Sequence, residues 1–180
     1  MDFTIEVSLA HPPAAAQDAL LDPDFVHTTG DLPMLGGAEV LECTHNEQTA
    51  RLRVRYKFTA PLSRAVTSVI DPDKLTWVDD GTFDLAAFRS EHVLLPDHYA
   101  DRLDAHYTST LVADGAGARW TVHGSLEVHA PLVGGKVAHV IVDGLREAVA
   151  GQGARLDDWI ARGPGPERPA PEAPRAGGEA

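Results

Sequence analysis

The sequence predicts an α+β domain with seven strands, two short helices after the first strand and one long helix near the C-terminus. Three observations lead to this fold class. Residues 131–161 repeat apolar side chains at helical spacing, residues 2–9 alternate apolar and polar side chains, and residues 114–117 have the composition of a hairpin turn. The length of 180 residues suits a single domain with its own core.

The N-terminal strand is predicted at residues 2–9, with one face in the core and the other in solvent. Pro12 and Pro13 end it, and Pro13 suits the first turn of a short helix because its backbone angle is already helical. A second short helix is expected to start after Asp22, which can cap it. Residues 29–37 are predicted to form a loop.

Six more strands are predicted, at residues 37–46, 49–60, 74–84, 86–95, 102–114 and 118–130. In the second of these, Leu52, Val54, Tyr56 and Phe58 alternate with Arg51, Arg53, Arg55 and Lys57, which are expected to point outward. Asp79, Asp80 and Gly81 interrupt the pattern of the strand at 74–84. Residues 61–70 are either a short helix or an irregular crossover.

The last two strands form a hairpin whose register follows from its turn. If the turn centres near Ala116, Tyr107 lies opposite Gly124 and Ser109 opposite Val122. A slip by one residue would turn all these side chains to the other face.

The long helix at residues 131–161 is predicted to be amphipathic. Its apolar face comprises Val137, Ile141, Leu145, Ala148, Val149, Leu156 and Trp159, and its polar face Lys136, His139, Asp143, Arg146, Glu147 and Asp157. Small residues follow one flank, namely Gly144, Ala148, Gly151 and Ala154. Since a helical glycine costs roughly 1 kcal/mol relative to alanine, either another backbone approaches this flank or a space is left beside it. We favour the space.

Charge and cysteine content exclude several classes of function. The net charge of −12 argues against nucleic acid and anionic membranes as partners, because both require a positive surface. Cys43 is the sole cysteine, so an intrachain disulfide cannot form. The N-terminus lacks a signal peptide pattern and no apolar run has the length of a membrane span, which predicts a cytoplasmic protein without integral membrane association.

Two stretches carry a resemblance to a known family: residues 1–26 and residues 122–149, the latter including PLVGGK at 131–136. With the order of elements, they resemble the START-like, helix-grip proteins of the SRPBCC superfamily, and within it an actinobacterial family known as a domain of unknown function. The resemblance implies a curved, seven-stranded antiparallel sheet around the C-terminal helix, enclosing a cavity for apolar or lipid-like molecules. Some members are polyketide cyclases or aromatases. The family brings no established catalytic residues.

The resemblance divides the chain into a START-like domain at residues 1–162 and a tail at residues 163–180. The tail is rich in proline, glycine, alanine and charge, a composition that predicts disorder.

The candidate ligand-binding residues lie on the faces expected to be concave. They are Tyr56, Phe58, Trp77, His92, Tyr107, Ser109, Trp120, Ile141, Gly144, Leu145, Ala148 and Gln152. Aromatic walls with a few polar groups are typical of small-molecule sites, although the same residues also describe a filled core. His92 and Tyr107 are the candidates for acid–base chemistry.

Histidines also invite a metal hypothesis. His123 and Glu127 are four strand residues apart, roughly 13 Å, too far to ligate one ion together. Glu127 with His129 and a cross-strand group would be closer, but a solvent-exposed sheet face is the simpler interpretation. No phosphate-binding loop, nucleotide fingerprint or nucleophile elbow occurs, so neither a metal nor a cofactor is predicted.

Three hypotheses follow. The first is binding of a hydrophobic small molecule, lipid-like or polyketide-like, in a cavity between sheet and helix. The second is an enzyme of the polyketide cyclase or aromatase type that uses the same cavity. The third is a protein-interaction module with a filled core, which would bind another protein through the basic row of residues 51–57 or through the C-terminal tail.

Overall fold

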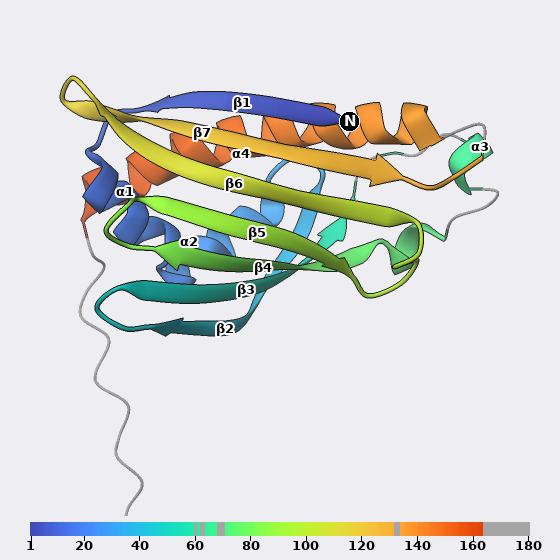
Figure 1. Ribbon diagram of the computed structural model, residues 1–180, viewed down its shortest axis with the longest axis horizontal. Coiled ribbons are helices and arrows are strands. Elements are labelled where there is room, and N and C mark those ends of the chain that lie inside the picture. Colours follow the sequence, from blue (N-terminus) through green and yellow to red (C-terminus); the bar gives the residue numbers. More distant parts are fainter. Residues whose placement is uncertain (60, 62–63, 68–70, 132–133, 164–180) are drawn as a thin grey trace, which may run out of the picture.

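The computed structural model describes residues 1–180 except 60, 62–63, 68–70, 132–133 and 164–180, so the predicted tail lies almost entirely outside the described residues. One curved antiparallel sheet wraps around a long C-terminal helix (Figure 1). The elements in chain order are β1 (Asp2–Leu9), α1 (Pro13–Leu20), α2 (Pro23–Thr28), η1 (Thr29–Asp31), β2 (Leu35–His45), β3 (Thr49–Phe58), α3 (Arg64–Thr67), η2 (Pro72–Lys74), β4 (Thr76–Asp84), β5 (Arg89–Pro96), β6 (Leu103–Asp114), β7 (Gly117–Val128) and α4 (Gly134–Arg162).

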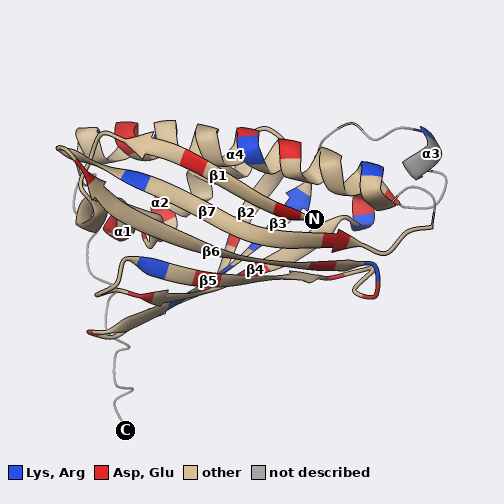
Figure 2. Cartoon of the chain, turned by 45° about the horizontal axis from the view of Figure 1, so that its top comes forward, with Lys and Arg blue, Asp and Glu red and all other residues tan. Residues whose placement is uncertain are grey.

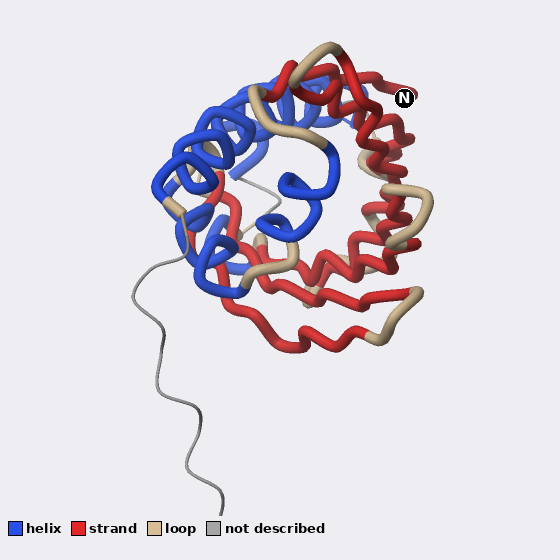
Figure 3. The backbone as a smooth tube through the Cα atoms, turned by 90° about the vertical axis from the view of Figure 1, so that its left-hand side faces the viewer, coloured by secondary structure: helices blue, strands red, loops and turns tan. Residues whose placement is uncertain are grey.

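The sheet has the strand order β1-β7-β6-β5-β4-β3-β2. Strands β1 and β2 follow each other in the chain but lie at opposite edges, because α1, α2 and η1 carry the chain from one edge to the other. Seen along the strands, the sheet curves around one side and the helices close the other (Figure 3). The predicted α+β fold of seven strands and a long C-terminal helix is confirmed.

Local signals in the sequence are confirmed in detail. Pro13 occupies the first turn of α1, and the Asp22 side chain accepts a hydrogen bond from the backbone N–H of Asp24 as the cap of α2. In the β6–β7 hairpin, Tyr107 pairs with Gly124 and Ser109 with Val122, as predicted. A Cβ at position 124 would come within 2.6 Å of the Tyr107 Cβ, so the close pairing requires glycine there.

Strand β2 starts earlier than predicted, at Leu35 within the predicted loop, whereas β4 and β5 start later. Strand β5 begins at Arg89 and not at residue 86, because Phe88 has a φ of 49°. That left-handed backbone conformation cannot continue a strand. The strand at residues 74–84, whose pattern Asp79, Asp80 and Gly81 interrupt, is nevertheless formed as β4 over Thr76–Asp84.

Helix α4 packs on β1, β7 and α1. Its most buried side chains are Ala138, Val142, Ala148, Val149 and Leu156. Ile141 and Leu145 are predicted on the apolar face, whereas both are only half-buried. The reason is that this part of the helix borders a cavity and not a packed surface. No helix within the described ranges has both the length and the apolar character needed to cross a membrane.

The outer face of the sheet carries the basic row of β3, as predicted. Each of these cations has an acidic neighbour: Arg51 and Arg53 pair with Asp80, Arg55 with Asp97 and Glu39, and Lys57 with Asp73. Elsewhere too, acidic and basic positions are interleaved, as along α4 in Figure 2. The row is therefore neutralised within the molecule, which removes the main support for docking of an acidic partner.

Candidate functional site

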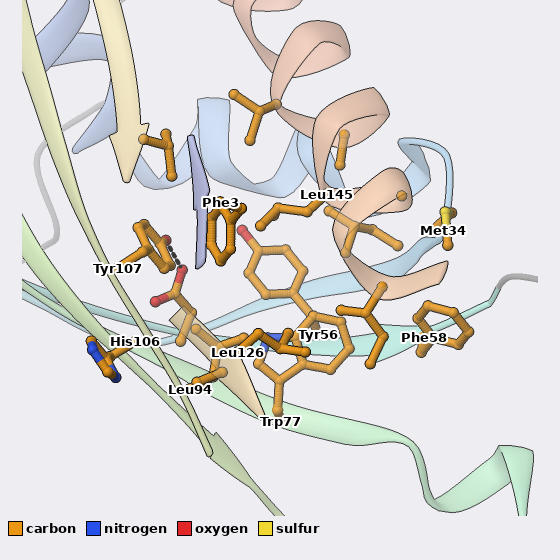
Figure 4. A pocket seen from close by; sticks show the side chains of 18 of the residues that line it. Phe3, Met34, Tyr56, Phe58, Trp77, Leu94, His106, Tyr107, Leu126 and Leu145 are labelled. Atoms are coloured by element: carbon orange, nitrogen blue, oxygen red, sulfur yellow. Dashed lines mark hydrogen bonds between the residues drawn. The ribbon is translucent and has the colours of Figure 1, made fainter. Parts of the chain in front are cut away.

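A cavity of about 130 Å³ lies between the concave face of the sheet and α4 (Figure 4). It is lined by Phe3, Met34, Leu35, Tyr56, Phe58, Trp77, Asp79, Leu94, Ala105, His106, Tyr107, Trp120, Val122, Ser125, Leu126, Ile141, Gly144, Leu145, Ala148, Val149 and Gln152. Most of these side chains are apolar or aromatic, as in sites that bind small molecules.

Strand alternation brings the aromatic walls together. Tyr56 on β3 lies directly opposite Trp77 on β4, with their ring centroids 5.9 Å apart. Because side chains two residues apart share a face, Asp79 follows Trp77 on the cavity side of β4. Figure 4 shows Tyr107 on one side of the cavity and Met34 with Phe58 on the other.

A hydrogen-bonded cluster extends from the cavity wall into the sheet. The Tyr107 hydroxyl donates to Asp79 Oδ2 at 2.6 Å, and His92 Nδ1 lies 2.9 Å from Asp79 Oδ1. His92 Nε2 lies 2.9 Å from the Ser90 hydroxyl, and the His92 ring stacks on Tyr107 with centroids 4.3 Å apart. Burial, reinforced by the negative charge of Asp79, raises the pKa of Tyr107 well above its ordinary value.

Two further polar groups of the cavity wall have partners of their own. The Thr29 hydroxyl donates to the Val26 carbonyl and lies 3.3 Å from the Tyr56 hydroxyl, so Tyr56 is the donor of that pair. Burial raises the pKa of Tyr56. The Trp120 indole N–H donates to the Ser109 hydroxyl at 2.7 Å. These bonds hold both rings in place at the cavity wall.

The small residues of α4 have different neighbours. Gly144 and Ala148 line the cavity, Gly151 faces Leu32, and Ala154 is exposed. The atoms nearest to a Cβ built at Gly144 all belong to the Met34 side chain and not to a backbone. The Met34 thioether occupies the space that this Cβ would need, so that part of the predicted space is filled by a flexible side chain.

Met34 itself has an unusual backbone conformation. Its φ is 68°, in the left-handed region that residues other than glycine rarely adopt. It lies in the short loop between η1 and β2, which is all that remains of the loop predicted at residues 29–37, and its carbonyl accepts a hydrogen bond from the backbone N–H of Thr59. The loop thus presents the Met34 side chain to the cavity and to α4 together.

Most of the predicted ligand-binding residues surround this one cavity. His92 and Ser109 do not line it: His92 lies behind Tyr107 and Asp79, and Ser109 is buried against Trp120. The remaining predicted residues all line it, namely Tyr56, Phe58, Trp77, Tyr107, Trp120, Ile141, Gly144, Leu145, Ala148 and Gln152.

Asp79 is the functional candidate that sequence reasoning missed. The carboxylate was interpreted as an interruption of the strand pattern. The sequence nevertheless indicates where Asp79 points. Residues 77, 79 and 83 alternate onto one face of a strand, so the Asp79 side chain shares the inward face of Trp77 and Phe83.

His106 of β6, His123 of β7 and His129, just after β7, are exposed, and His106 also borders the cavity. His123 lies 2.9 Å from the Thr4 hydroxyl and His129 pairs with Glu127 at 3.4 Å. Among the residues with described positions, no three His, Cys, Asp or Glu side chains come together as a metal site would require.

Solved structures share this architecture. The structure of TTHA0849 from Thermus thermophilus aligns over 88% of this chain and 95% of its own, with 16% identity and a TM-score of 0.64. The Zhui aromatase/cyclase from Streptomyces sp. R1128 aligns over 88% and 92%, with 14% identity and a TM-score of 0.60. Ara h 8.0201 aligns over 90% and 98%, with 15% identity and a TM-score of 0.57.

The topology and these similarities define a helix-grip fold, the fold that the sequence resemblance to START-like proteins predicts. The chain belongs to the family described as "Protein of unknown function (DUF2505)", whose profile matches residues 4–160. No functionally curated protein matches the sequence significantly.

Proposed function

We propose that the protein binds a hydrophobic small molecule, lipid-like or polyketide-like, in the cytoplasm, and that it holds this ligand between the sheet and α4. The observation that carries the proposal is the cavity itself. Its walls are aromatic and aliphatic, and protein interiors with such side chains are normally filled to close packing. Burial of apolar ligand surface supplies the affinity. The fold shared with an aromatase/cyclase supports the same ligand class.

The size of the cavity limits what it holds as it stands. A cavity of roughly 150 Å³ accommodates one benzene ring, so 130 Å³ takes a single ring or a short chain. A longer ligand requires movement at the cavity wall. Met34 is the side chain that moves in our proposal, because a thioether side chain is flexible and fills the space beside Gly144.

The experiment is native mass spectrometry of the protein purified from its own host, followed by extraction and identification of the bound molecule. Ala148→Leu places bulk in the cavity and is expected to abolish the adduct. Ala154→Leu adds the same bulk at an exposed position of α4 and is expected to retain it.

Ile141→Ala is a second variant for use if Ala148→Leu does not fold. It enlarges the cavity and introduces no steric overlap. We expect it to retain the adduct. A protein without any adduct, and without thermal stabilisation by a panel of lipids and polyketides, would contradict the proposal.

A second candidate function is a cyclase or aromatase activity in the same cavity. The observation that favours it is the Tyr107–Asp79–His92 cluster, which provides proton donors and acceptors at an apolar wall. An enclosed polyketide chain would be held folded so that two of its carbons meet. The test is turnover of an aromatic polyketide precursor by Tyr107→Phe and His92→Ala variants. Unchanged turnover in both variants would remove this assignment.

A further inference from the structure

The Asp79 carboxylate stands in the wall of a largely apolar cavity. None of the described residues that line the cavity is lysine or arginine, and the bonded partners of Asp79 are the Tyr107 hydroxyl and the His92 ring. Burial of a carboxylate is costly unless hydrogen bonds compensate. The fold keeps Asp79 there although an apolar residue would extend the wall formed by Trp77 and Leu94.

The hydrogen bonds of the cluster are satisfied with a neutral His92. The Ser90 hydroxyl then donates to Nε2, and Nδ1–H donates to Asp79 Oδ1. Tyr107 donates to the other carboxylate oxygen. With His92 in this neutral form the cluster carries one negative charge, and a carboxylate, with about four acceptor positions, has two that Tyr107 and His92 do not use.

We propose that Asp79 selects the ligand by charge: it accepts a hydrogen bond from a hydroxyl group on an aromatic or otherwise apolar skeleton, and it excludes ligands that end in a carboxylate. This inference rests on the proposed binding function and names the ligand chemistry. A second carboxylate beside Asp79 would bring two like charges together in a medium of low dielectric constant. A hydroxyl donor meets an acceptor that is already held in place by Tyr107 and His92.

The test compares three probes with one ring each: toluene, phenol and benzoate. Their dissociation constants are measured at neutral pH by titration in protein-observed NMR. We expect toluene and phenol to bind, and benzoate to bind at least roughly tenfold more weakly than phenol, the size of effect that hydrogen bonds to charged groups produce. Equal binding of benzoate and phenol would overturn the selection by charge.

Two neighbouring carboxylates provide a matched pair of variants. Asp79→Asn removes the charge at the cavity, and the ratio of benzoate to phenol affinity is expected to rise roughly tenfold. Asp80→Asn removes the same charge from the next residue, whose side chain pairs with Arg51 on the outer face, and is expected to leave the ratio unchanged. An unchanged ratio in Asp79→Asn, or an equal rise in both variants, would overturn the proposal.

Tyr107→Phe keeps the proposal testable if Asp79→Asn does not fold. It removes a donor to Asp79 but leaves the carboxylate, so benzoate should still be excluded and phenol should bind at least as tightly as before. Loss of the exclusion in this variant would contradict selection by Asp79. The failure of the binding function and the failure of charge selection give different results. If none of the three probes binds, the proposed binding function fails as well. If toluene binds but benzoate binds as well as phenol, only the selection by Asp79 fails.

Discussion

The two halves of α4 differ in what they pack against. In the C-terminal half, Leu156 is fully buried, and Gly153 faces Val7 of β1 so closely that a Cβ would come within 2.6 Å of its methyl carbon. In the N-terminal half, Ile141 and Leu145 are half-buried and border the cavity. One amphipathic helix thus packs tightly on β1 around Gly153 and Leu156, while Ile141 and Leu145 border a cavity although their neighbour Val142 is fully buried.

Leu156 and Leu145 allow a direct test of this difference, because they are eleven residues apart, about three helical turns, and lie on similar faces. We expect the largest effect from Leu156→Ala. It creates a void in a packed core, and we expect a loss of about 2–5 kcal/mol in the free energy of unfolding. Urea denaturation measures it. A loss below about 1 kcal/mol would mean that the C-terminal half is not tightly packed.

The cavity tyrosines should make the protein sensitive to alkali. The pKa values of Tyr56 and Tyr107 are raised in the folded state, so both hold their protons more tightly than in the unfolded chain, whose tyrosines have the ordinary value of 10.0. Their contribution to stability is complete below this value and is lost as the pH rises further. The free energy of unfolding should fall by up to about 1.4 kcal/mol per pH unit for each tyrosine.

The measurement is urea denaturation between neutral pH and the alkaline range, in the wild type and in Tyr107→Phe. The variant is expected to show a smaller slope above the ordinary tyrosine pKa. An identical slope would show that Tyr107 does not contribute to the alkaline loss.

Leu145→Ala should cost clearly less than Leu156→Ala, about 1 kcal/mol, because its side chain already borders empty space and gives up fewer contacts. Binding should change more than stability, since the cavity becomes larger. Denaturation and toluene titration of the same variant measure both. Equal losses for the two leucines would remove the distinction between the halves of the helix.

The smallest effect is expected on the outer face of the sheet. A hydrogen bond from Arg51 lowers the pKa of Asp80 below its ordinary value of 3.8, so the pair stabilises the fold above this value and the contribution disappears as the pH falls through the folded-state pKa. Asp80→Asn should cost under about 1 kcal/mol at neutral pH and nothing in strong acid. Denaturation at both pH values checks this, and a constant cost across the range would contradict it.

Particular residues show where prediction from sequence succeeds and where it stops. The pairing of Tyr107 with Gly124 follows from one turn and the two-residue period of strands, so it was predictable. The partners of Asp79 were not, because His92 and Tyr107 lie on two other strands. Phe88 was placed in a strand because its apolar character fits one, and only its backbone angle shows the turn.

The existence of the seven strands, the amphipathic helix and the register of the last hairpin follow from the sequence alone, because they depend on periodicity and turn chemistry within short segments. Only the folded chain shows that Ile141 and Leu145 of α4 border a cavity, that Met34 lies against Gly144, and that Asp79 faces the cavity while Asp80 faces outward. These properties depend on the curvature of the whole sheet and on how side-chain volumes add up across elements distant in the chain, which no local pattern contains.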